Sequence, residues 1–259
     1  MNSKIPAGVR KVVILGALSG IAQATARELA GKGASIVLIA RNPDRLKQLA
    51  DDLSVRGAGK IVTRSLDLAQ TGEWDSVLDD AAGELGGLDT VLLFYGTLGD
   101  QDRAEKDPAL AADLLRVNFT SAADWVLAAA RRFEQNPVSG AAILVASSVA
   151  GDRGRRSNFI YGAAKGGLSI LMQGLAHKFA ALPEPRPKAI TAKLGFVDTP
   201  MTAHIAKKGA LWAKPEDVGR KLAAALEKSS PIIYVPGMWR LIMLIIRTVP
   251  NFIFNKVNL

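Results

Sequence analysis

The amino-acid sequence predicts one α/β domain built on a doubly wound parallel sheet of about seven strands. The chain has 259 residues, which suits one large domain, and no Ser-, Pro- or Gly-rich linker divides it. Short, almost continuously apolar runs alternate with longer segments of helical periodicity, as expected for strands buried on both faces and their crossover helices. We assign residues 1–236 to this domain and residues 237–259 to an apolar, basic C-terminal helical extension.

The expected elements follow from these runs in order. Strands are predicted in KVVILG, SIVLIARN, KIVTRSL, LDTVLLF, AAILVASS, PKAITAKL and PIIYVP. Helices are predicted in IAQATARELAGKG, PDRLKQLADDLSVRG, TGEWDSVLDDAAGEL, PALAADLLRVNFTSAADWVLAAARRFEQN and YGAAKGGLSILMQGLAHKFAAL. Asn118 lies inside the fourth helical segment, where its poor helix propensity predicts a local kink stabilised by its side chain.

Composition excludes several kinds of site. The chain has no cysteine, so it has no disulfide and no thiolate metal site. His177 and His204 have no neighbouring ligands in the sequence, and we expect no metal. The net charge of +9 comes without a nucleic-acid motif, so we expect no nucleic-acid partner. The apolar run VVIL is too short for a signal peptide, so we expect it to be the first strand and the protein to be cytoplasmic.

A glycine-containing turn joins the first strand to the first helix. Gly16, Ser19, Gly20 and Ile21 lie in it. The glycines allow a tight turn and close approach to a pyrophosphate, whose charge is favoured at the helix N-terminus. The alternative is an ordinary strand-to-helix turn, because glycine pairs are common at helix starts.

Arg41 follows the second strand, about twenty residues after the glycine turn. An acidic residue at this place binds the ribose 2′-hydroxyl of a dinucleotide, whereas an arginine can bind a 2′-phosphate. The sequence therefore favours NADP(H), with NAD(H) as the alternative. A solvated arginine is the competing interpretation, and Asp44 is close enough in the sequence to contact a ribose.

Ser148, Tyr161 and Lys165 form the candidate catalytic set. Tyr161 and Lys165 are four residues apart, so a helix places them on one face, and a neighbouring ammonium is expected to lower the pKa of the phenol. Ser148 ends a buried strand, where its hydroxyl could bind a substrate carbonyl. Together they could polarise a ketone and protonate the alkoxide. The alternative for such a pair is a half-buried ring beside a solvated charge.

From Lys11 to Thr202 this order of parts resembles the short-chain dehydrogenase/reductase family, which has a Rossmann-type fold. The resemblance implies catalytic roles for Ser148, Tyr161 and Lys165, with Asn118 helping to hold a proton-relay water. It also implies cofactor contacts in three regions: adenine at Asp67 and Leu68, ribose at Gly96, and the nicotinamide carboxamide at Val197 and Thr199.

The chain departs from the family pattern at several positions. Leu15 and Ala22 replace the usual threonine and glycine of the glycine turn, and Leu194 replaces a proline. Leu93-Phe94-Tyr95-Gly96 stands where the family has Asn-Asn-Ala-Gly, so only the glycine is kept. These substitutions remove a hydroxyl and two asparagine side chains that stabilise the glycine turn and the central strand in the family.

The C-terminal segment combines apolar residues with cations. Twelve of the seventeen residues from Met238 to Phe254 are apolar, and no acidic residue follows Glu227. Two arginines and Pro250 argue against a transmembrane span. A helix in a membrane interface, a cover over an apolar substrate channel, and a core or dimer-interface helix remain the alternatives.

A closer resemblance comes from the FYGTLGD loop, the arginine-rich GDRGRRSNFIYG and this C-terminus. In this combination the chain is similar to the decaprenylphosphoryl-2-keto-pentose reductases. The resemblance implies a lipid-linked sugar substrate and a flavin-dependent oxidase partner. Arg153, Arg155 and Arg156 could then bind the phosphodiester. A homo-oligomer and peripheral membrane contact are further expectations. The rivals are a soluble reductase of a small ketone or a 3-oxoacyl thioester, and a non-catalytic dinucleotide sensor or scaffold.

Overall fold

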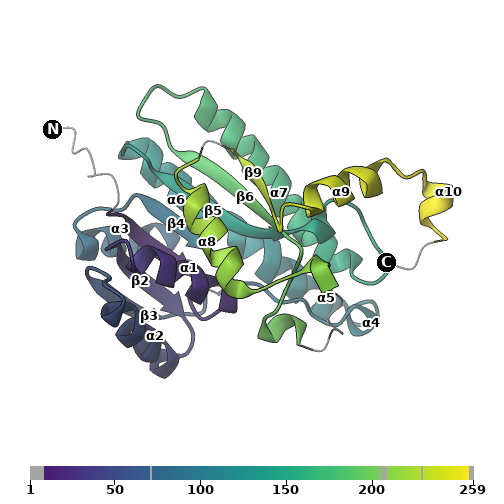
Figure 1. Cartoon of the computed structure of the whole chain (residues 1–259), viewed down its shortest axis with the longest axis horizontal. Helices are drawn as coiled ribbons and strands as arrows, with labels where there is room; N and C mark the ends of the chain where they lie inside the picture. Colours follow the sequence, from purple (N-terminus) through teal and green to yellow (C-terminus); the bar gives the residue numbers. More distant parts are fainter. Residues whose placement is uncertain (1–8, 71, 204, 206–208, 229, 257–259) are drawn as a thin grey trace.

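A seven-stranded parallel sheet forms the centre of the molecule (Figure 1). The computed structural model describes residues 9–70, 72–203, 205, 209–228 and 230–256. The strand order is β3-β2-β1-β4-β5-β6-β9, and every neighbouring pair is parallel, which confirms the predicted fold class. The strands are β1 Lys11–Leu15, β2 Ser35–Ala40, β3 Ile61–Ser65, β4 Thr90–Leu93, β5 Ala142–Ser148, β6 Lys188–Leu194 and β9 Ile232–Val235.

Helices connect the strands and cover both faces of the sheet. They are α1 Gly20–Ala30, α2 Pro43–Val55, α3 Trp74–Leu85, α4 Gln101–Ala104, α5 Pro108–Leu115, α6 Ser121–Gln135, α7 Phe159–Ala180, α8 Pro215–Ala225, α9 Trp239–Thr248 and α10 Asn251–Phe254. Two further short strands, β7 Phe196–Val197 and β8 Trp212–Ala213, pair with each other in a separate sheet. The sequence did not predict this pair, because two residues carry no recognisable period.

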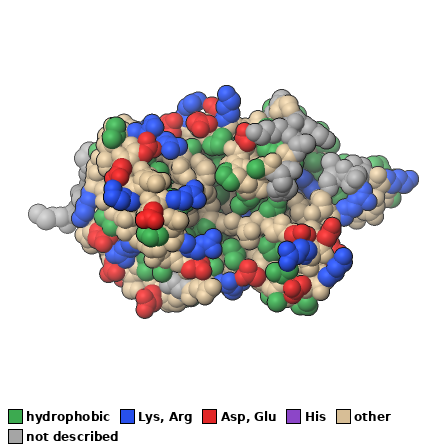
Figure 2. Space-filling model, turned by 90° about the horizontal axis from the view of Figure 1, so that it is seen from below, with side chains coloured by type: hydrophobic (Ala, Val, Ile, Leu, Met, Phe, Trp, Pro, Cys, Tyr) green, Lys and Arg blue, Asp and Glu red, His purple; other side chains and the backbone are tan. Residues whose placement is uncertain are grey.

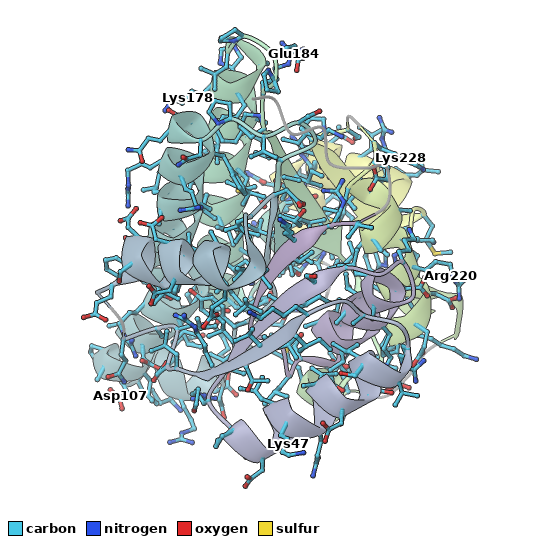
Figure 3. The ribbon with its side chains drawn as sticks, turned by 90° about the vertical axis from the view of Figure 1, so that its left-hand side faces the viewer. Lys47, Asp107, Lys178, Glu184, Arg220 and Lys228 are labelled. Carbon is cyan, nitrogen blue, oxygen red and sulfur yellow. The ribbon has the colours of Figure 1, made fainter. Side chains whose placement is uncertain are left out.

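The side chains of the central strands alternate between two apolar cores. Val12 and Ile14 of β1 pack with α1, α2 and α8, whereas Val13 and Leu15 pack with α3, α6 and α7. A strand covered on both faces must be apolar throughout, which explains the KVVIL run. Figure 3 shows the two helix layers, with Lys178 of α7 on one side of the sheet and Arg220 of α8 on the other.

The winding of the chain reverses between β1 and β4. From β1 the sheet grows through β2 to β3, and from β4 it grows in the opposite direction through β5 and β6 to β9. Because crossovers next to this point are right-handed, α1 and α2 lie on one face of the sheet and α6 and α7 lie on the other, and the loops after β1 and β4 diverge. The last crossover helix, α8, returns to the face of α1 and α2. A crevice therefore opens at the carboxyl ends of these two strands.

The long helical segment around Asn118 is interrupted by a π-helical turn at Arg116–Thr120. The side-chain Nδ2 of Asn118 donates to the carbonyl oxygen of Leu114 at 2.9 Å and to that of Thr97 at 2.8 Å. An asparagine that competes for backbone carbonyls in this way locally changes the helix. The predicted kink and its cause are confirmed.

The C-terminal residues form an arm, which consists of α9 and α10 and projects from one end of the molecule (Figure 1). Pro250 separates the two helices, as the sequence predicted. Trp239 and Met243 of α9 are buried beside Val149 in a small third core. None of the helices within the described ranges is long and apolar enough to cross a membrane.

Candidate active site

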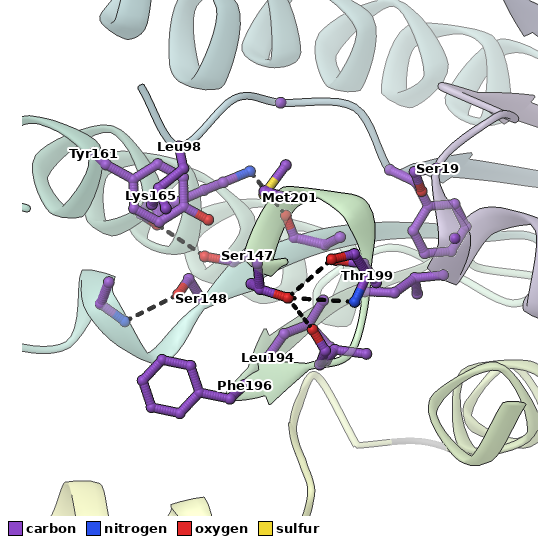
Figure 4. A pocket seen from close by; sticks show the side chains of 18 of the residues that line it. Ser19, Leu98, Ser147, Ser148, Tyr161, Lys165, Leu194, Phe196, Thr199 and Met201 are labelled. Atoms are coloured by element: carbon purple, nitrogen blue, oxygen red, sulfur yellow. Dashed lines mark hydrogen bonds between the residues drawn. The ribbon is translucent and has the colours of Figure 1, made fainter. Parts of the chain in front are cut away.

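A cavity of about 350 Å³ lies at the carboxyl ends of the central strands. Its walls come from the start of α1, the loops after β4 and β5, α7, and the segment after β6. The residues predicted for function that line it are Ser19, Gly20, Ile21, Gly96, Asn118, Ser148, Arg155, Tyr161, Lys165, Val197 and Thr199. Figure 4 shows Ser148, Tyr161 and Lys165 at one end of this cavity and Ser19 at the other.

Tyr161 and Ser148 form a hydroxyl pair inside the cavity. Ser148 is the last residue of β5, and its Oγ also accepts a hydrogen bond from the backbone N–H of Ala150 at 3.1 Å. Tyr161 lies in the first turn of α7. Burial raises the pKa of Tyr161 to about 12, and the hydrogen bond with Ser148 acts in the opposite direction. In this structure the phenol therefore holds its proton firmly.

Lys165 is buried one helical turn after Tyr161, with an exposed fraction of 4%. Its Nζ donates to the carbonyl oxygen of Ala146 at 3.0 Å and lies 5.8 Å from the centre of the Tyr161 ring. Burial lowers the pKa of this ammonium to about 8. The sequence predicted that the ammonium would lower the pKa of the phenol. That was wrong for this structure, because the ammonium is directed at the β5 carbonyl and desolvation of Tyr161 dominates.

Asn118 and Gly96 lie next to each other, close to the ammonium of Lys165. Asn118 is fully buried, and its Oδ1 accepts from the backbone N–H of Thr97 at 3.1 Å. A Cβ on Gly96 would lie 2.6 Å from this Oδ1 and 3.3 Å from Nζ of Lys165, and the φ of Gly96 is +156°. Both the space and the backbone conformation require glycine. Gly96 thus lets the loop after β4 approach Lys165.

The glycine turn after β1 has the shape of a phosphate cradle. Gly16 has a φ of +82°, and a Cβ there would lie 2.6 Å from the backbone nitrogen of Tyr95. Ser19 caps α1 by accepting from the N–H of Ala22 at 3.1 Å. A Cβ on Gly20 would come within 3.3 Å of Cγ2 of Thr199. The residues present therefore fit a pyrophosphate between the start of α1 and Thr199.

The residues predicted to contact the adenine side lie outside the cavity walls in the described ranges. Arg41 is exposed just after β2, and Asp67 accepts from the N–H of Ala69 at 3.1 Å in a local turn. The side chain of Leu68 is buried in the core, and its carbonyl accepts from Nε1 of Trp125 at 3.0 Å. Gly16, which was predicted to lie beside the pyrophosphate, is also outside the cavity walls. Their contacts with a cofactor stay predictions.

The segment after β6 closes the other side of the cradle. The hydroxyl of Thr202 donates to the carbonyl of Val197 at 2.6 Å, and the N–H of Thr199 donates back to Thr202 Oγ1 at 3.3 Å. These bonds fix a short helical turn at Pro200–Thr202. Leu194, which replaces the family proline, is buried at the end of β6 without disturbing the strand.

Arg45 and Tyr95 also line the cavity, and the sequence analysis gave neither of them a role. Arg45 lies in the first turn of α2, and a second arginine only four residues after Arg41 was the signal that could have identified it. Tyr95 stands where the family has an alanine. Its hydroxyl lies 2.9 Å from Oγ of Ser121, and burial raises its pKa above the ordinary value. No sequence signal indicates that a tyrosine here would bond a serine on α6.

The three arginines predicted to bind substrate have different surroundings. Arg153 binds the carbonyls of Ile246 and Val249 and packs 3.8 Å from the ring centre of Phe254. The sequence analysis expected Arg153 to bind a substrate phosphodiester. In the structure its guanidinium instead caps the C-terminal end of α9. Arg155 lines the cavity, and Arg156 lines a second hollow beside α10.

Arg155 carries a charge that the protein only partly compensates. Its Nε is buried without a hydrogen-bond partner in the described part of the chain, and its Nη2 lies 3.5 Å from Sδ of Met243. Burial lowers the pKa of this guanidinium, and the charge of Asp152 acts against that effect. However, Asp152 pairs with the buried Lys193 and accepts from the hydroxyl of Tyr234 at 2.8 Å.

No cluster of His, Cys, Asp and Glu that could hold a metal occurs among the residues that the structure describes. His177 is exposed in the last turn of α7, which suits a helix-end role. His204 lies outside the described residues.

Comparison with known proteins agrees with this geometry. Residues 10–210 match the family model described as short chain dehydrogenase. An uncharacterized oxidoreductase of Mycobacterium tuberculosis is 34% identical over 252 residues, which cover 96% of this chain and 98% of the relative.

Two solved structures share the fold. A variant of the actinorhodin polyketide ketoreductase with NADPH has a TM-score of 0.74 at 20% identity and covers 87% of this chain and 95% of its own. A short chain dehydrogenase from Mycobacterium paratuberculosis bound to NAD has a TM-score of 0.73 at 21% identity, with coverage of 86% and 95%. From the family match and the full-length relative, this chain belongs to the short-chain dehydrogenase/reductase family and is an oxidoreductase.

Proposed function

We propose that the protein reduces a ketone to a secondary alcohol with a nicotinamide dinucleotide, and that the ketone belongs to a phosphate-linked sugar carried on a lipid. The observation that supports ketone reduction with a dinucleotide is the shared cavity. It brings Ser148, Tyr161, Lys165 and Asn118 to one end and the glycine cradle at the start of α1 to the other. A substrate carbonyl between the two ends would lie within reach of both.

The chain's own residues supply the proton and the orientation. The hydroxyl of Ser148 would donate a hydrogen bond to the carbonyl oxygen, and the phenol of Tyr161, which keeps its proton near neutral pH, would protonate the oxygen that becomes an alcohol. Lys165, with a pKa of about 8, is mostly protonated at neutral pH. Its positive charge would offset the negative charge of the phenolate that remains after Tyr161 has given up its proton. The bound dinucleotide supplies the hydride to the carbonyl carbon.

The preference for NADP(H) is part of the proposal, with NAD(H) as the alternative. Arg41 is exposed beyond β2, and Arg45, in the first turn of α2, lines the cavity. Two guanidinium groups at this corner would favour a 2′-phosphate. The structural neighbours support a nicotinamide dinucleotide of either kind, since one holds NADPH and another holds NAD.

The substrate class rests on Arg155 and on the arm. A small neutral ketone would leave the half-buried guanidinium of Arg155 without an anion in the cavity, whereas a phosphodiester would pair with it. The closer resemblance stated above makes this substrate a polyprenyl-phosphoryl 2-keto-pentose. It also gives the protein a flavin-dependent oxidase partner, which would form the ketone, and a place at the inner face of a membrane. We also propose that the protein forms a homo-oligomer.

The proton donor is tested by Tyr161→Phe. Loss of the phenol should reduce kcat for ketone reduction by about 10²–10⁴-fold, because general acid catalysis contributes that much, while dinucleotide affinity stays near the native value. Tyr234→Phe is the matched control, since its hydroxyl binds Asp152 outside the cavity. Steady-state rates and a nicotinamide fluorescence titration measure both effects. Native activity in Tyr161→Phe would refute the assignment, and binding without any turnover by the native protein would support a sensor.

At pH values below the folded-state pKa of Lys165, its buried charge should lower the free energy of unfolding of the protein. Lys165→Met should therefore raise the free energy of unfolding at pH 7 by on the order of 1–3 kcal/mol. The gain should shrink as pH rises from about 8 toward the ordinary value of 10.5, because the native lysine then becomes neutral in the folded state. Urea unfolding of both proteins across this pH range measures the difference.

Lys193→Met provides the contrast for that experiment. Lys193 is about as buried as Lys165 but is paired with Asp152, so its removal should lower stability by taking the paired cation away from a buried carboxylate. A pH-independent effect of Lys165→Met would contradict the assigned pKa.

Arg41 sets the expected cofactor preference. The native protein should use NADPH with a higher kcat/KM than NADH, and Arg41→Asp should abolish or reverse that ratio, because a carboxylate repels the 2′-phosphate and accepts from a 2′-hydroxyl. Arg56→Ala, an exposed arginine at the far end of α2, is the control. Equal use of both dinucleotides by the native protein would show that Arg41 has no such role.

Arg155 distinguishes the proposed substrate from a neutral ketone. Arg155→Ala should raise KM for a short-chain phosphodiester of a keto-pentose by about 10- to 100-fold, the equivalent of one lost charged hydrogen bond. The same variant should reduce a small neutral ketone as the native protein does. Equal KM values for the phosphodiester in both proteins would remove the support for a phosphate-bearing substrate and favour the soluble ketone reductase.

A further inference from the structure

The arm has two faces of different kinds. Trp239 and Met243 of α9 are buried in the third core, and Ile242 and Ile246 pack against that core. These residues repeat at the spacing of one helical face. Leu241, Leu244 and Ile245 lie on the opposite face and are exposed by 64%, 60% and 56%. The inward face is therefore explained by packing, and the outward face has no intramolecular function within the described chain.

The outward apolar surface extends beyond α9. Phe252 and Ile253 of α10 are exposed by 71% and 45%, and Ile170 of α7 by 70%. Ile170, Leu241 and Leu244 line one open hollow between α7 and α9. Large apolar side chains gathered at one end of a molecule mark an interaction surface more strongly than scattered ones do. We call these five residues, with Ile245, the outward patch.

The unpaired charges around the outward patch that the structure describes are positive, because Asp152, which also lines the hollow, is paired with Lys193. Arg240 and Arg247 line the same hollow as Leu241 and Leu244, and Lys256 follows α10. No acidic residue follows Glu227. Figure 2 shows Lys and Arg side chains with hydrophobic ones on the projecting end of the molecule, whereas the body carries both signs. This combination complements an anionic, apolar partner.

Two kinds of partner could cover such a surface. In a two-fold dimer through this face, each copy would bring the same cations toward the other, and no carboxylate of the arm could compensate them. An anionic lipid bilayer accepts both components, because apolar side chains enter the acyl boundary while arginines stay at the phosphates. The charges thus favour a bilayer over a second copy.

We propose that the outward patch docks on the surface of an anionic lipid bilayer, with α9 and α10 lying in the interface. This inference deepens the proposed function, since a lipid-borne ketone would be met at that surface. The arm is also linked to the cavity. Arg153, from the segment between Ser148 and Tyr161, binds the carbonyls at the end of α9, and Arg155 contacts Met243.

Point variants of the outward face test the docking without disturbing the inward face. Leu241→Ser combined with Leu244→Ser should weaken flotation with vesicles of phosphatidylcholine and phosphatidylglycerol by about tenfold or more, because two exposed leucines lose their burial in lipid. Val55→Ser, which changes an apolar residue exposed by 90% on α2, is the matched control and should float as the native protein does.

A charge variant tests the electrostatic part. The native protein should prefer vesicles with phosphatidylglycerol over phosphatidylcholine alone, and Arg240→Glu should remove this preference. Lys221→Glu on α8, an exposed cation outside the arm, makes the same change of charge and should keep it. Failure of the native protein to float with the anionic vesicles would overturn the docking.

Two further readouts separate the docking from the proposed function. The Leu241 and Leu244 double variant should reduce a water-soluble ketone at the native rate and should keep the native molecular mass in solution. A native protein that floats but reduces no ketone would refute the proposed function and leave the docking intact. A double variant that dissociates from an oligomer and still floats like the native protein would assign the patch to a contact between copies and overturn the docking.

Discussion

The reversal of winding between β1 and β4 is the constraint on which the rest of the structure depends. Because the crossovers next to β1 and β4 are right-handed, the change of direction places α1 and α2 on one face of the sheet and α6 and α7 on the other. At that point no crossover helix closes the ends of the strands, so the crevice is a consequence of topology before any side chain is chosen. The start of α1 and the loop after β4 become its walls. Gly16 and Gly96 let those walls approach each other and Lys165.

Much of this arrangement could be predicted from the sequence because it is local and periodic. Buried parallel strands must be apolar on both faces, and a poor helix former such as Asn118 inside a helical segment indicates a break. The shared cavity of Ser148, Tyr161 and Lys165 followed from a strand end and a helical spacing. The roles of the individual residues in binding and catalysis stay predictions.

What could not be predicted depends on contacts between distant segments. Arg153, Arg155 and Arg156 look alike in the sequence, yet one holds a helix end, one lines the cavity and one lies beside α10. Likewise, the pKa of Tyr161 depends on the direction in which the Lys165 ammonium points. Spacing places the two side chains on one face but does not tell that Ala146 is the acceptor. Such outcomes are properties of packing.

The bond between Arg153 and the end of α9 has a consequence for cooperativity. The last carbonyls of a helix lack intrahelical partners, and here a side chain from the loop after β5 supplies them. Val149 shares a core with Trp239 and Met243, so the loop and the arm also exclude water together. Segments joined in this way open as one unit, and the backbone amides of α9 should exchange with deuterium at the same free energy as those of the loop that leads to Tyr161. A terminal segment that looks like an appendage in the sequence is thereby part of the smallest cooperative unit around the active site.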